Sequence, residues 1–600
     1  MTDIAMTIPD LHAAYARGVS PEQIIAQVYT RFRDVDDPCI FLSMASEADA
    51  QAEAAAIGLY DPAKPLWGVP FAVKDNIDVA GYETTAACPA YAYTPTQDAF
   101  VVAKLREAGA IFIGKTNLDQ FATGLVGVRT PYGAPRNSID PEIVPGGSSG
   151  GSGVAVGHGI VAFSLGTDTA GSGRVPAALN NIVGLKPTLG ALSATGVVPA
   201  CRSVETISIF ALTVADAYTA FSVACAYDAA DAYARPFTAP ALAAPKPAPV
   251  IGIPSRESIR FSGDAVQEAS FNAAVDLLRD QGAEIREIDF TPLYDVAEML
   301  YEGAWVAERY TVIADLLHKE PEAILSVTRQ VICKAEALSA ADAFRGMYRL
   351  KELSRIAETA LEGLDMLCVP TIPTFHTVAE LEADPIGPNS NFGTYTNFVN
   401  LLDMCGIAVP VPARNDGRPG SVTLLAAAGK DAEIAASGLA LEAAGQRKLG
   451  ATDWPFTSAP TPKPAAADGL TLAVCGAHMD GLPLNHQLTE RGANYLGAAT
   501  TTDSYRFYAL AGDPPARPGL VKGTTGSGAP IAVELWSLPV ETVGSFLKGI
   551  PAPLGIGTVD LSDGRQVKGF ICEAEAIADS ADITQLGDWR QYLAQSVSDT

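Results

Sequence analysis

The nine cysteines of this sequence include no CxxC pair, and their number is odd. Disulfide frameworks and zinc sites need cysteines at paired spacings, so we expect buried free thiols in a reducing compartment. No apolar run is long enough to span a bilayer, because the longest, residues 153–166, is interrupted by His158 and several glycines. The first eleven residues lack the basic and apolar regions of a signal peptide. We therefore expect a cytoplasmic protein that does not contact membranes.

Positive charge is also scarce. The 600 residues include 41 Lys and Arg against 68 Asp and Glu, which gives a formal net charge of −27. A chain this acidic repels a phosphate backbone, so we expect no nucleic-acid partner. Apolar residues make up 48% of the chain. That composition, at this length, predicts two or more domains with large buried cores.

Composition shifts suggest where the domains meet. Residues 457–469 are rich in proline, alanine and small polar residues, which cannot form a core, so we predict a linker there. The linker would separate a large domain over residues 1–456 from a small one over residues 470–600. A second Pro/Ala-rich stretch, 235–249, is either another boundary or a surface excursion within the large domain.

The two predicted domains differ in their patterns. In the large one, helical patterns alternate with short apolar runs, which is typical of an α/β fold with helices on a central sheet. In the small one, apolar runs lie between Gly/Pro turns, which predicts a sheet-rich α+β domain. The helical patterns cover 98–108 and 271–280, and the apolar runs cover 110–114, 160–165, 250–254, 366–370, 470–475, 531–536 and 566–572.

Two glycine- and serine-rich stretches, 145–153 and 166–176, lie between hydrophobic runs. A flexible linker is disfavoured because linkers do not alternate with core segments. Neither GxxxxGK[ST] nor a clean GxGxxG after a strand is present, so no phosphate loop is indicated. A GxSxG nucleophile elbow at 146–150 is an alternative, but two prolines precede it and no downstream histidine has an informative context.

Three separated motifs carry a family resemblance. Lys74 lies in GVPFAVKDN, Ser148 in GGSSGGS and Ser172 in GTDTAGSGR, in that order along the chain. This arrangement, over about residues 11–450, resembles the amidase signature family. The resemblance implies an amidase-signature fold, in which helices cover a central mixed β-sheet. One departure is Ala170, where many members have a second glycine.

The resemblance implies a Ser-cisSer-Lys triad. A serine hydroxyl is a weak nucleophile until a base takes its proton, and burial lowers the pKa of a lysine so that it can serve as that base. Lys74, directly after the apolar run 69–73, would be the base. Ser148, preceded by a cis peptide bond, would relay the proton from Ser172, the nucleophile. Alone, Lys74 would be assigned to a surface salt bridge with Asp75.

The neighbours of the expected nucleophile have assigned parts as well. The resemblance implies that the backbone N–H groups of Thr169, Ala170 and Gly171 hold the oxyanion. We expect Asp168 and Arg174 to brace the loop as an ion pair. The implied reaction needs no metal and no organic cofactor.

The substrate is suggested by residues 298–311, which we predict to form one helix carrying Tyr301 and Arg309 two turns apart. An arginine fork binds carboxylates well. The alternative is core packing for Tyr301 and a surface ion pair of Arg309 with Glu302 or Glu308. Together with the extension after residue 470, the layout resembles the allophanate hydrolases.

That resemblance implies that Tyr301, Arg309 and Gly124 bind allophanate, a small anionic amide, and that ammonia is released in urea degradation. It also implies a homodimer and action beside a urea carboxylase. The alternatives are another small-amide amidase, one component of an amidotransferase, or a non-catalytic scaffold.

The small domain carries two candidate histidines. Residues 474–479 and 484–488 look like the strand–loop opening of the γ-glutamyl cyclotransferase-like fold, but 545–551 lacks the glutamate of those enzymes. In allophanate hydrolases this domain is linked to decarboxylation of the first product. The resemblance makes His486 the first candidate and His478 the second. The alternative is that both support a turn and the domain mediates contacts.

Overall fold

The computed structural model describes residues 3–242, 245–246, 248–445, 447–457, 469–512, 514–578 and 580–598. The predicted linker, 457–469, lies outside the described residues except at its two ends. Two compact units emerge: unit 1 comprises residues 1–239 and 247–459, and unit 2 comprises residues 240–246 and 460–600. No helix in the described ranges combines the length and the apolar character that a membrane crossing requires.

Unit 1 is built on one large mixed sheet. Its central strands pair in parallel (β2 with β3 and β4), while β4–β6, β5–β6, β5–β10 and β10–β11 pair antiparallel. This is the central mixed sheet that the family resemblance predicts. In spatial order the strands are β1 (Phe41–Met44), β3 (Ile111–Thr116), β2 (Pro70–Lys74), β4 (Phe163–Asp168), β6 (Thr206–Ala211), β5 (Val183–Lys186), β10 (Met404–Val411), β11 (Gly420–Ala427), β9 (Met366–Pro370), β7 (Val250–Pro254) and β8 (Glu284–Ile288).

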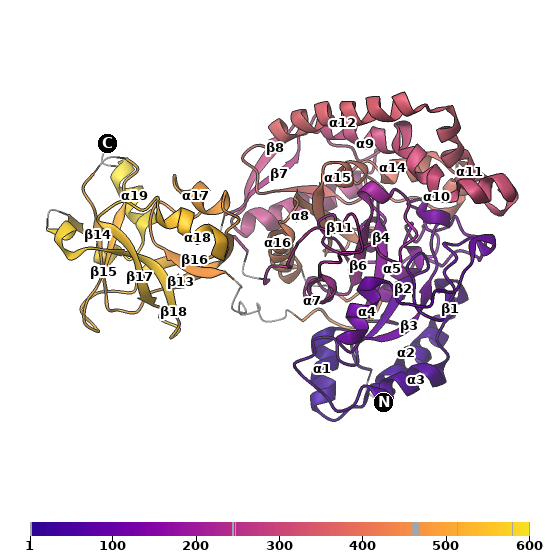
Figure 1. Cartoon of the computed structure of the whole chain (residues 1–600), viewed down its shortest axis with the longest axis horizontal. Helices are drawn as coiled ribbons and strands as arrows, with labels where there is room; N and C mark the ends of the chain where they lie inside the picture. Colours follow the sequence, from indigo (N-terminus) through magenta and orange to yellow (C-terminus); the bar gives the residue numbers. More distant parts are fainter. Residues whose placement is uncertain are drawn as a thin grey trace. The chain divides into compact units, whose positions relative to one another are not determined.

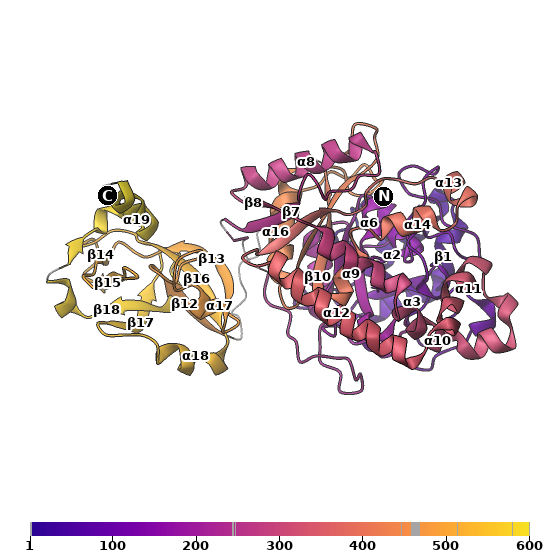
Figure 2. The same ribbon diagram turned by 90° about the horizontal axis from the view of Figure 1, so that it is seen from above.

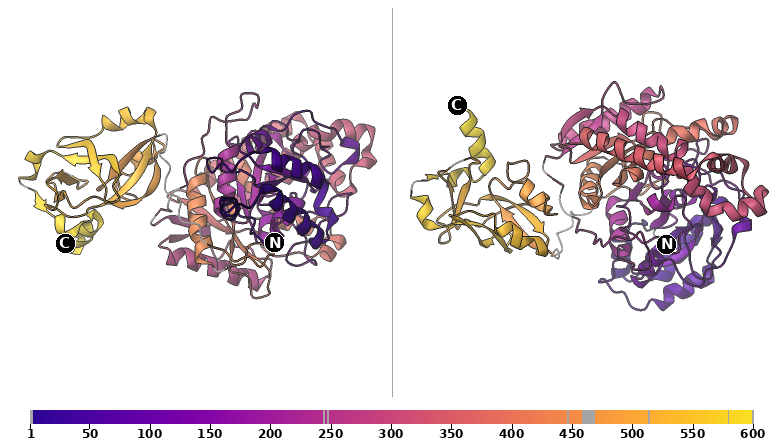
Figure 3. Two further views of the ribbon diagram at one scale, coloured as in Figure 1. Left: turned by 90° about the horizontal axis from the view of Figure 1, so that it is seen from below. Right: turned by 45° about the horizontal axis from the view of Figure 1, so that its top comes forward.

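Helices surround this sheet. The N-terminal helices α1–α3 lie at the bottom of unit 1 in Figure 1, and α9 and α12 lie at its top. Figure 2 shows unit 1 from above, with α8, α9 and α12 facing the viewer, and the left panel of Figure 3 shows it from below, with the indigo N-terminal helices in front. The helices are α1 (Ile8–Ala16), α2 (Pro21–Val35), α3 (Glu47–Ala56), α4 (Phe100–Glu107), α5 (Gly150–Gly157), α6 (Val175–Leu179), α7 (Val214–Ala224), α8 (Ala265–Asp280), α9 (Thr291–Glu302), α10 (Trp305–Lys319), α11 (Ser326–Ile332), α12 (Ala340–Ala360), α13 (Val378–Ala383), α14 (Gly387–Phe392), α15 (Asn397–Leu401) and α16 (Asp431–Ala444).

The central strands are apolar along their whole length because both faces are covered. All five residues of β2 and all six residues of β3, β4 and β6 are buried. Two-sided burial explains why these strands read as continuous apolar runs rather than as alternating patterns. It also means that polar residues at their ends, such as Lys74 and Asp168, are held in a water-poor interior.

Unit 2 has its own hydrophobic core and contains two sheets. The first contains β13 (Asn494–Thr500), β16 (Ala532–Leu538), β12 (Leu470–Val474), β18 (Gln566–Cys572) and β17 (Leu554–Asp560), in that order. The second contains β15 (Pro518–Lys522), β14 (Tyr505–Ala509) and β19 (Ala581–Asp582). Three helices complete it: α17 (His486–Thr489), α18 (Val540–Leu547) and α19 (Trp589–Ser598). The small sheet-rich α+β domain expected after residue 470 is therefore present.

One prediction about local structure is wrong. Residues 298–311 do not form one helix, because α9 ends at Glu302 and α10 begins at Trp305. Gly303 between them adopts an extended conformation (φ −105°, ψ −166°). Glycine loses more backbone freedom than other residues when it is fixed in a helix, so a break at this position is the least costly one.

All nine cysteines are free thiols. Six of them are buried, and burial raises the pKa of several of these thiols, including Cys201 and Cys368, to about 12. They behave as small core residues rather than as reactive groups.

Candidate active site

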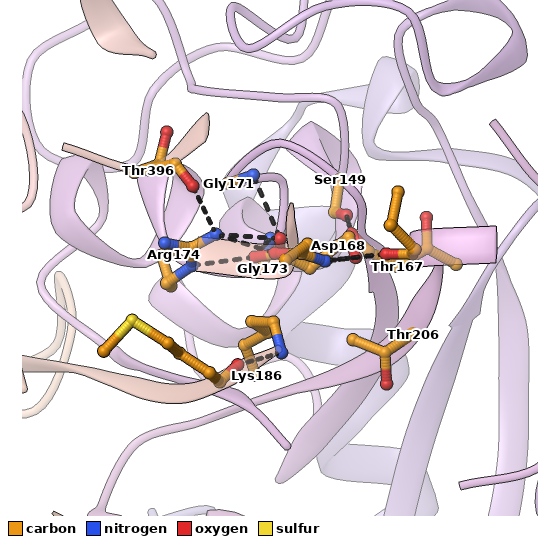
Figure 4. A network of polar contacts seen from close by, with 12 residues as sticks. Ser149, Thr167, Asp168, Gly171, Gly173, Arg174, Lys186, Thr206 and Thr396 are labelled. Carbon is orange, nitrogen blue, oxygen red and sulfur yellow. Dashed lines mark hydrogen bonds and ion pairs between the residues drawn. The ribbon is translucent and has the colours of Figure 1, made fainter. Parts of the chain in front are cut away.

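A tight loop follows strand β4 and carries Ser172. Asp168, the last residue of β4, accepts hydrogen bonds from the backbone N–H groups of Gly171 (3.0 Å) and Gly173 (2.9 Å). Its carboxylate also accepts two bonds from Arg174, from Nε at 3.0 Å and from Nη2 at 2.9 Å (Figure 4). Both side chains are fully buried. The ion pair expected here is confirmed, and it fixes the backbone on either side of Ser172.

Gly171 cannot be replaced by a larger residue in this loop. Its φ of +127° lies in a region that L side chains rarely adopt, and a Cβ would lie 2.5 Å from Thr396 Oγ1. Glycine is therefore required for the backbone to pass beneath Thr396. Ser172 follows at once, with 3% of its surface exposed.

Lys74 ends strand β2, next to β4 in the sheet. Its Nζ donates hydrogen bonds to Ser148 Oγ and to Thr167 Oγ1, both at 2.7 Å. The rival interpretation, an ion pair with Asp75, does not hold, because Asp75 lies 3.4 Å from Lys115 Nζ instead. The side chain of Lys74 is completely buried.

Burial lowers the pKa of Lys74 to about 7. The carboxylates of Glu205, Asp119 and Asp168 act in the opposite direction, because a nearby negative charge favours the ammonium form, and Arg309 adds to the lowering. A large fraction of the amine is therefore uncharged near neutral pH, as a lysine base requires.

Ser148 is held by its backbone as well as by Lys74. The Gly147–Ser148 peptide bond is cis, and the Ser148 carbonyl accepts a hydrogen bond from the Asp119 N–H at 2.9 Å. The Asp119 carboxylate in turn accepts from the N–H groups of Gly127 (2.9 Å) and Arg129 (2.8 Å). In the described part of the chain, no hydrogen bond joins the hydroxyls of Ser148 and Ser172.

The amides expected to face an oxyanion fall into two groups. The Gly171 N–H donates to Asp168 and is therefore engaged. Within the described residues, the N–H groups of Thr169 and Ala170 have no protein acceptor, although both residues are buried. Two buried, unengaged N–H groups beside Ser172 leave donors for an incoming oxygen.

Tyr301 and Arg309 meet although they lie on different helices. Arg309 Nη2 donates to Tyr301 Oη at 3.2 Å, and the guanidinium lies 4.9 Å from the centre of the tyrosine ring. The break at Gly303 brings the two side chains together, rather than a shared helix face. Arg309 Nη1 donates to Thr123 Oγ1 at 3.2 Å and to the Ala122 carbonyl at 3.4 Å.

The Arg309 guanidinium is a buried cation without an anionic partner. Only 1% of its surface is exposed, and among the described residues it forms no ion pair and its Nε has no acceptor. Its two expected partners are engaged elsewhere: Glu302 binds Lys334, and Glu308 binds Ser203. Glu205 and Glu308 act on Arg309 from a distance but form no ion pair with it, and a buried charge normally has a directly bound charged partner, so the guanidinium can still bind an anion.

Gly124 lies in the same region. It follows Thr123, whose hydroxyl contacts Arg309, and a Cβ at position 124 would lie 2.5 Å from Asp119 Oδ2. The structure thus brings Gly124, Tyr301 and Arg309 together, and Asp119 links them to Ser148.

Sequence reasoning missed Thr167, Asp119 and Glu205. Thr167 stands within the GTDTAGSG motif and was the easiest to find. Asp119 and Glu205 reach the site only through the fold, the first after β3 and the second directly before β6. Nothing in their local sequence marks them.

The two candidate histidines of unit 2 differ in position. His478 lines a pocket together with Gln487, Arg517 and Phe570, donates a hydrogen bond from Nε2 to Gln487 Oε1 (3.0 Å), and stacks on the Phe570 ring. Burial lowers the pKa of His478. His486 instead starts helix α17, and its Nδ1 lies 2.9 Å from the Pro483 carbonyl on the surface. The geometry favours His478, the second of the two candidates.

Comparison with known proteins places these features in a family. Residues 23–435 match the family described as Amidase, and residues 470–594 match the one described as allophanate hydrolase C-terminal domain. The urea amidolyases of Saccharomyces cerevisiae and Lachancea kluyveri are 44% and 45% identical to 88% of the chain. The chain spans about 30% of the length of these two relatives.

Solved structures agree with the family matches. The allophanate hydrolase of Kluyveromyces lactis is 40% identical, with a TM-score of 0.81 over 99% of this chain and 100% of the other. The urea amidolyase of the same yeast is 39% identical and gives a TM-score of 0.82, over 99% of this chain and 37% of that one. Both units of this chain therefore have counterparts within a single solved protein.

Proposed function

The chain belongs to the amidase family, and we propose that it is an allophanate hydrolase that releases ammonia from allophanate by serine catalysis. The observation that carries the proposal is the unpaired, buried guanidinium of Arg309 near Lys74 and Ser148. A small amide that carries its own carboxylate supplies the missing anion. The match of both units to allophanate hydrolase and urea amidolyase supports this substrate.

The first step uses the proton path from Ser172 to Lys74. The neutral Lys74 amine takes the Ser148 proton while Ser148 takes that of Ser172, and Ser172 Oγ attacks the terminal carbamoyl carbon. Before this transfer, substrate binding brings the hydroxyls of Ser148 and Ser172 into a hydrogen bond that is not present in the described chain, since such contacts often tighten only in the substrate complex. The N–H groups of Thr169 and Ala170 stabilise the oxyanion.

The intermediate then collapses. The terminal C–N bond breaks, and the proton held on Lys74 returns through Ser148 to the leaving nitrogen, so that ammonia departs. Water attacks the acyl group on Ser172 with Lys74 again as the base, and N-carboxycarbamate is released. Loss of carbon dioxide and breakdown of the carbamate give a second ammonia.

Tyr301 and Arg309 hold the substrate carboxylate in this scheme. The Nε of Arg309 has no acceptor among the described residues and can donate to the carboxylate. Burial raises the pKa of Tyr301, so its hydroxyl stays protonated and can donate as well. Gly124 is expected to help bind the substrate, because it follows Thr123, whose hydroxyl contacts Arg309. Binding energy at the carboxylate positions the carbamoyl end against Ser172.

The domain assignment forms part of the proposal: residues 1–456 perform this reaction, and residues 470–600 act on its product. The pocket of unit 2 that His478 lines is the proposed place for decarboxylation. An imidazole that stays neutral at physiological pH suits an acid or base there.

Assembly and location are also proposed. The chain would work as a cytoplasmic homodimer and beside a urea carboxylase, which its longer urea amidolyase relatives suggest. An exposed apolar patch on α12, formed by Phe344, Met347 and Tyr348, supports pairing of two copies.

Ammonia release from allophanate, measured against a panel of neutral amides and glutamine, tests the proposal. We expect allophanate to give the highest kcat/KM, and Ser172→Ala to abolish it. Fluorophosphonate labelling at Ser172 without allophanate turnover would instead favour a different amidase. No labelling and no turnover would favour a scaffold.

A further inference from the structure

A second carboxylate lies within this site, and the proposed reaction does not use it. Glu205 is buried at the start of β6, and one of its oxygens, Oε2, accepts a hydrogen bond from the Ala200 N–H at 2.6 Å. The other oxygen, Oε1, is shielded from solvent and accepts no hydrogen bond of normal geometry among the described residues, although the Thr169 hydroxyl interacts with this carboxylate. An unpaired, buried carboxylate oxygen is costly, so it calls for a reason.

Glu205 lies next to the loop that carries Ser172. Strands β4 and β6 pair with Asp168 opposite Thr206, so the residues just beyond them, Thr169 and Glu205, face each other. Asn400 joins the two segments, because its Nδ2 donates to the carbonyls of Asp168 (2.7 Å) and Val204 (2.9 Å). The Thr169 hydroxyl is also buried and interacts with the Glu205 carboxylate, although in the described part of the chain it forms no hydrogen bond of normal geometry.

The segment before Glu205 is fixed on its other side to α10. Ser203 Oγ donates to Glu308 at 2.7 Å, one residue before Arg309. Glu205 is therefore held between the Ser172 loop and the helix that carries Arg309. Its charge acts on both ends of the site: it opposes the lowering of the Lys74 pKa more than any other group, and it also interacts with Arg309.

We propose that Glu205 is a substrate-binding residue whose free oxygen accepts a hydrogen bond from the N–H between the two carbonyl groups of allophanate. The inference rests on the proposed function. With the carbamoyl carbon at Ser172 and the carboxylate at Arg309, that N–H occupies the middle of the substrate. A carboxylate between the two ends is placed to accept its proton in a charge-assisted hydrogen bond.

A purely structural role would not explain why a charged glutamate, rather than a glutamine, is buried at position 205. Bracing the Ala200 N–H needs one oxygen, and an uncharged glutamine would do it without burying a carboxylate. Burial raises the pKa of Glu205, while the hydrogen bonds from the Ala200 N–H and the Thr169 hydroxyl, and then the charges of Lys74 and Arg309, act against that shift. The charged groups that face Lys74 from the surrounding elements are Glu205, Asp119, Asp168 and Arg309.

The substitution Glu205→Gln gives a sharp test. The Ala200 N–H needs an oxygen acceptor, so the amide nitrogen of the glutamine must take the place of Oε1. Two N–H donors, that of the glutamine and that of the substrate, would then face each other without an acceptor. Malonamate, in which CH₂ replaces that N–H, avoids this clash. We expect kcat/KM for allophanate to fall by about 10- to 100-fold in the variant and that for malonamate to fall much less.

The pH dependence of kcat/KM in the Glu205→Gln variant gives a second test. Without the negative charge of Glu205, the pKa of Lys74 should fall further, so the acid limb of kcat/KM for malonamate should move to lower pH in Glu205→Gln. Asp216→Asn is the matched control, because Asp216 is also fully buried with one unpartnered oxygen, but contacts the N–H of Ile8 on α1 rather than this site. We expect it to change neither the substrate ratio nor the acid limb.

Equal loss with both substrates, or no loss with either, in a variant that melts like the wild type would overturn the inference. Should Glu205→Gln fail to fold, the wild type decides: if the Ki of malonamate as a competitor equals or lies below the KM of allophanate, the N–H makes no favourable contact. A wild-type enzyme that hydrolyses neutral amides but not allophanate would refute the proposed function itself, which the Glu205 outcomes do not.

Discussion

Arg174 binds Asp168 through two nitrogens, and both side chains are completely buried. The same carboxylate accepts the N–H groups that flank Ser172 on either side, those of Gly171 and Gly173. One ion pair therefore determines the path of the whole Ser172 loop. Thr396 and Asn400 add contacts to this loop, because both accept from Arg174, Asn400 donates to the Asp168 carbonyl and Thr396 packs against Gly171.

Asp168→Asn should damage stability as well as activity. Removing one partner leaves the Arg174 charge buried and unpaired, which typically costs about 3–5 kcal/mol. We expect a lower free energy of unfolding in urea and loss of ammonia release. Arg279→Met is the control, because its pair with Asp276 is exposed and should be worth less than about 1 kcal/mol. Equal effects of the two substitutions would show that the Asp168–Arg174 pair has no special part.

The pH dependence of kcat/KM should follow Lys74. The reaction needs the neutral amine, and the pKa of Lys74 lies at about 7, so the rate should rise with pH through 7 and level off above it. Lys74→Met should abolish the rate at every pH while Ser172 remains present. An acid limb near pH 10 would mean that the lysine is solvated, which is incompatible with the buried position in the structure.

Arg309→Met should select against charged substrates. We expect kcat/KM for allophanate to fall by about 100-fold or more, since a charge-assisted, bidentate contact is lost. Turnover of biuret, a neutral amide of similar shape, should change little. Arg329→Met, on neighbouring α11 and paired with Glu322, is the control and should leave both rates unchanged. Parallel losses for allophanate and biuret would show that Arg309 only supports the fold.

Thr167→Val tests a residue that the sequence did not mark. The substitution keeps the shape of the side chain but removes one of the two hydroxyls that accept from Lys74 Nζ. We expect kcat to fall by about tenfold, as for the loss of one hydrogen bond to a charged group, with the melting temperature nearly unchanged. The acid limb should also move to lower pH, because that hydroxyl favours the ammonium form. An unchanged profile would indicate that Ser148 alone orients the amine.

Decarboxylation of the first product should distinguish the parts that the two histidines of unit 2 play. His478→Asn should slow carbon dioxide release while ammonia release in the first step continues, because His478 lines the pocket. His486→Asn should have little effect, since its imidazole lies at the surface against the Pro483 carbonyl. The reverse result would move the proposed site from the pocket to the start of α17.

Short strands were predictable because turns bound their sequence patterns, both where the strand is almost wholly buried, as in β7 and β9, and where it is partly exposed, as in β18. Residues 250–254, 366–370 and 566–572 form β7, β9 and β18 with the expected bounds. The run at 160–165 was less well predicted, since β4 begins only at Phe163 and continues to Asp168. Residues 166–168 extend this strand because they pair with β6, which no apolar pattern records.

The site was predictable only where residues lie within motifs. Lys74, Ser148 and the Asp168–Arg174 pair stand in recognisable local sequences. Tyr301 and Arg309 were identified, but their meeting depends on the break at Gly303 and not on the predicted helix. Glu205 and Asp119 are more than 30 residues away from Ser172 in the chain. The pairing of β4 with β6 places Glu205 near the site, and the hydrogen bond from the Asp119 N–H to the Ser148 carbonyl places Asp119 there.

Residues 240–246 belong to unit 2, although the chain afterwards returns to unit 1 for residues 247–459. Lys246 in this early segment binds Asp480 at 2.8 Å. A protease that cuts between residues 457 and 469 would thus leave part of unit 2 covalently attached to the amidase fragment. Deleting the C-terminal piece at that point removes Asp480 from its contact with Lys246, so point substitutions inside unit 2 are the cleaner way to dissect its chemistry.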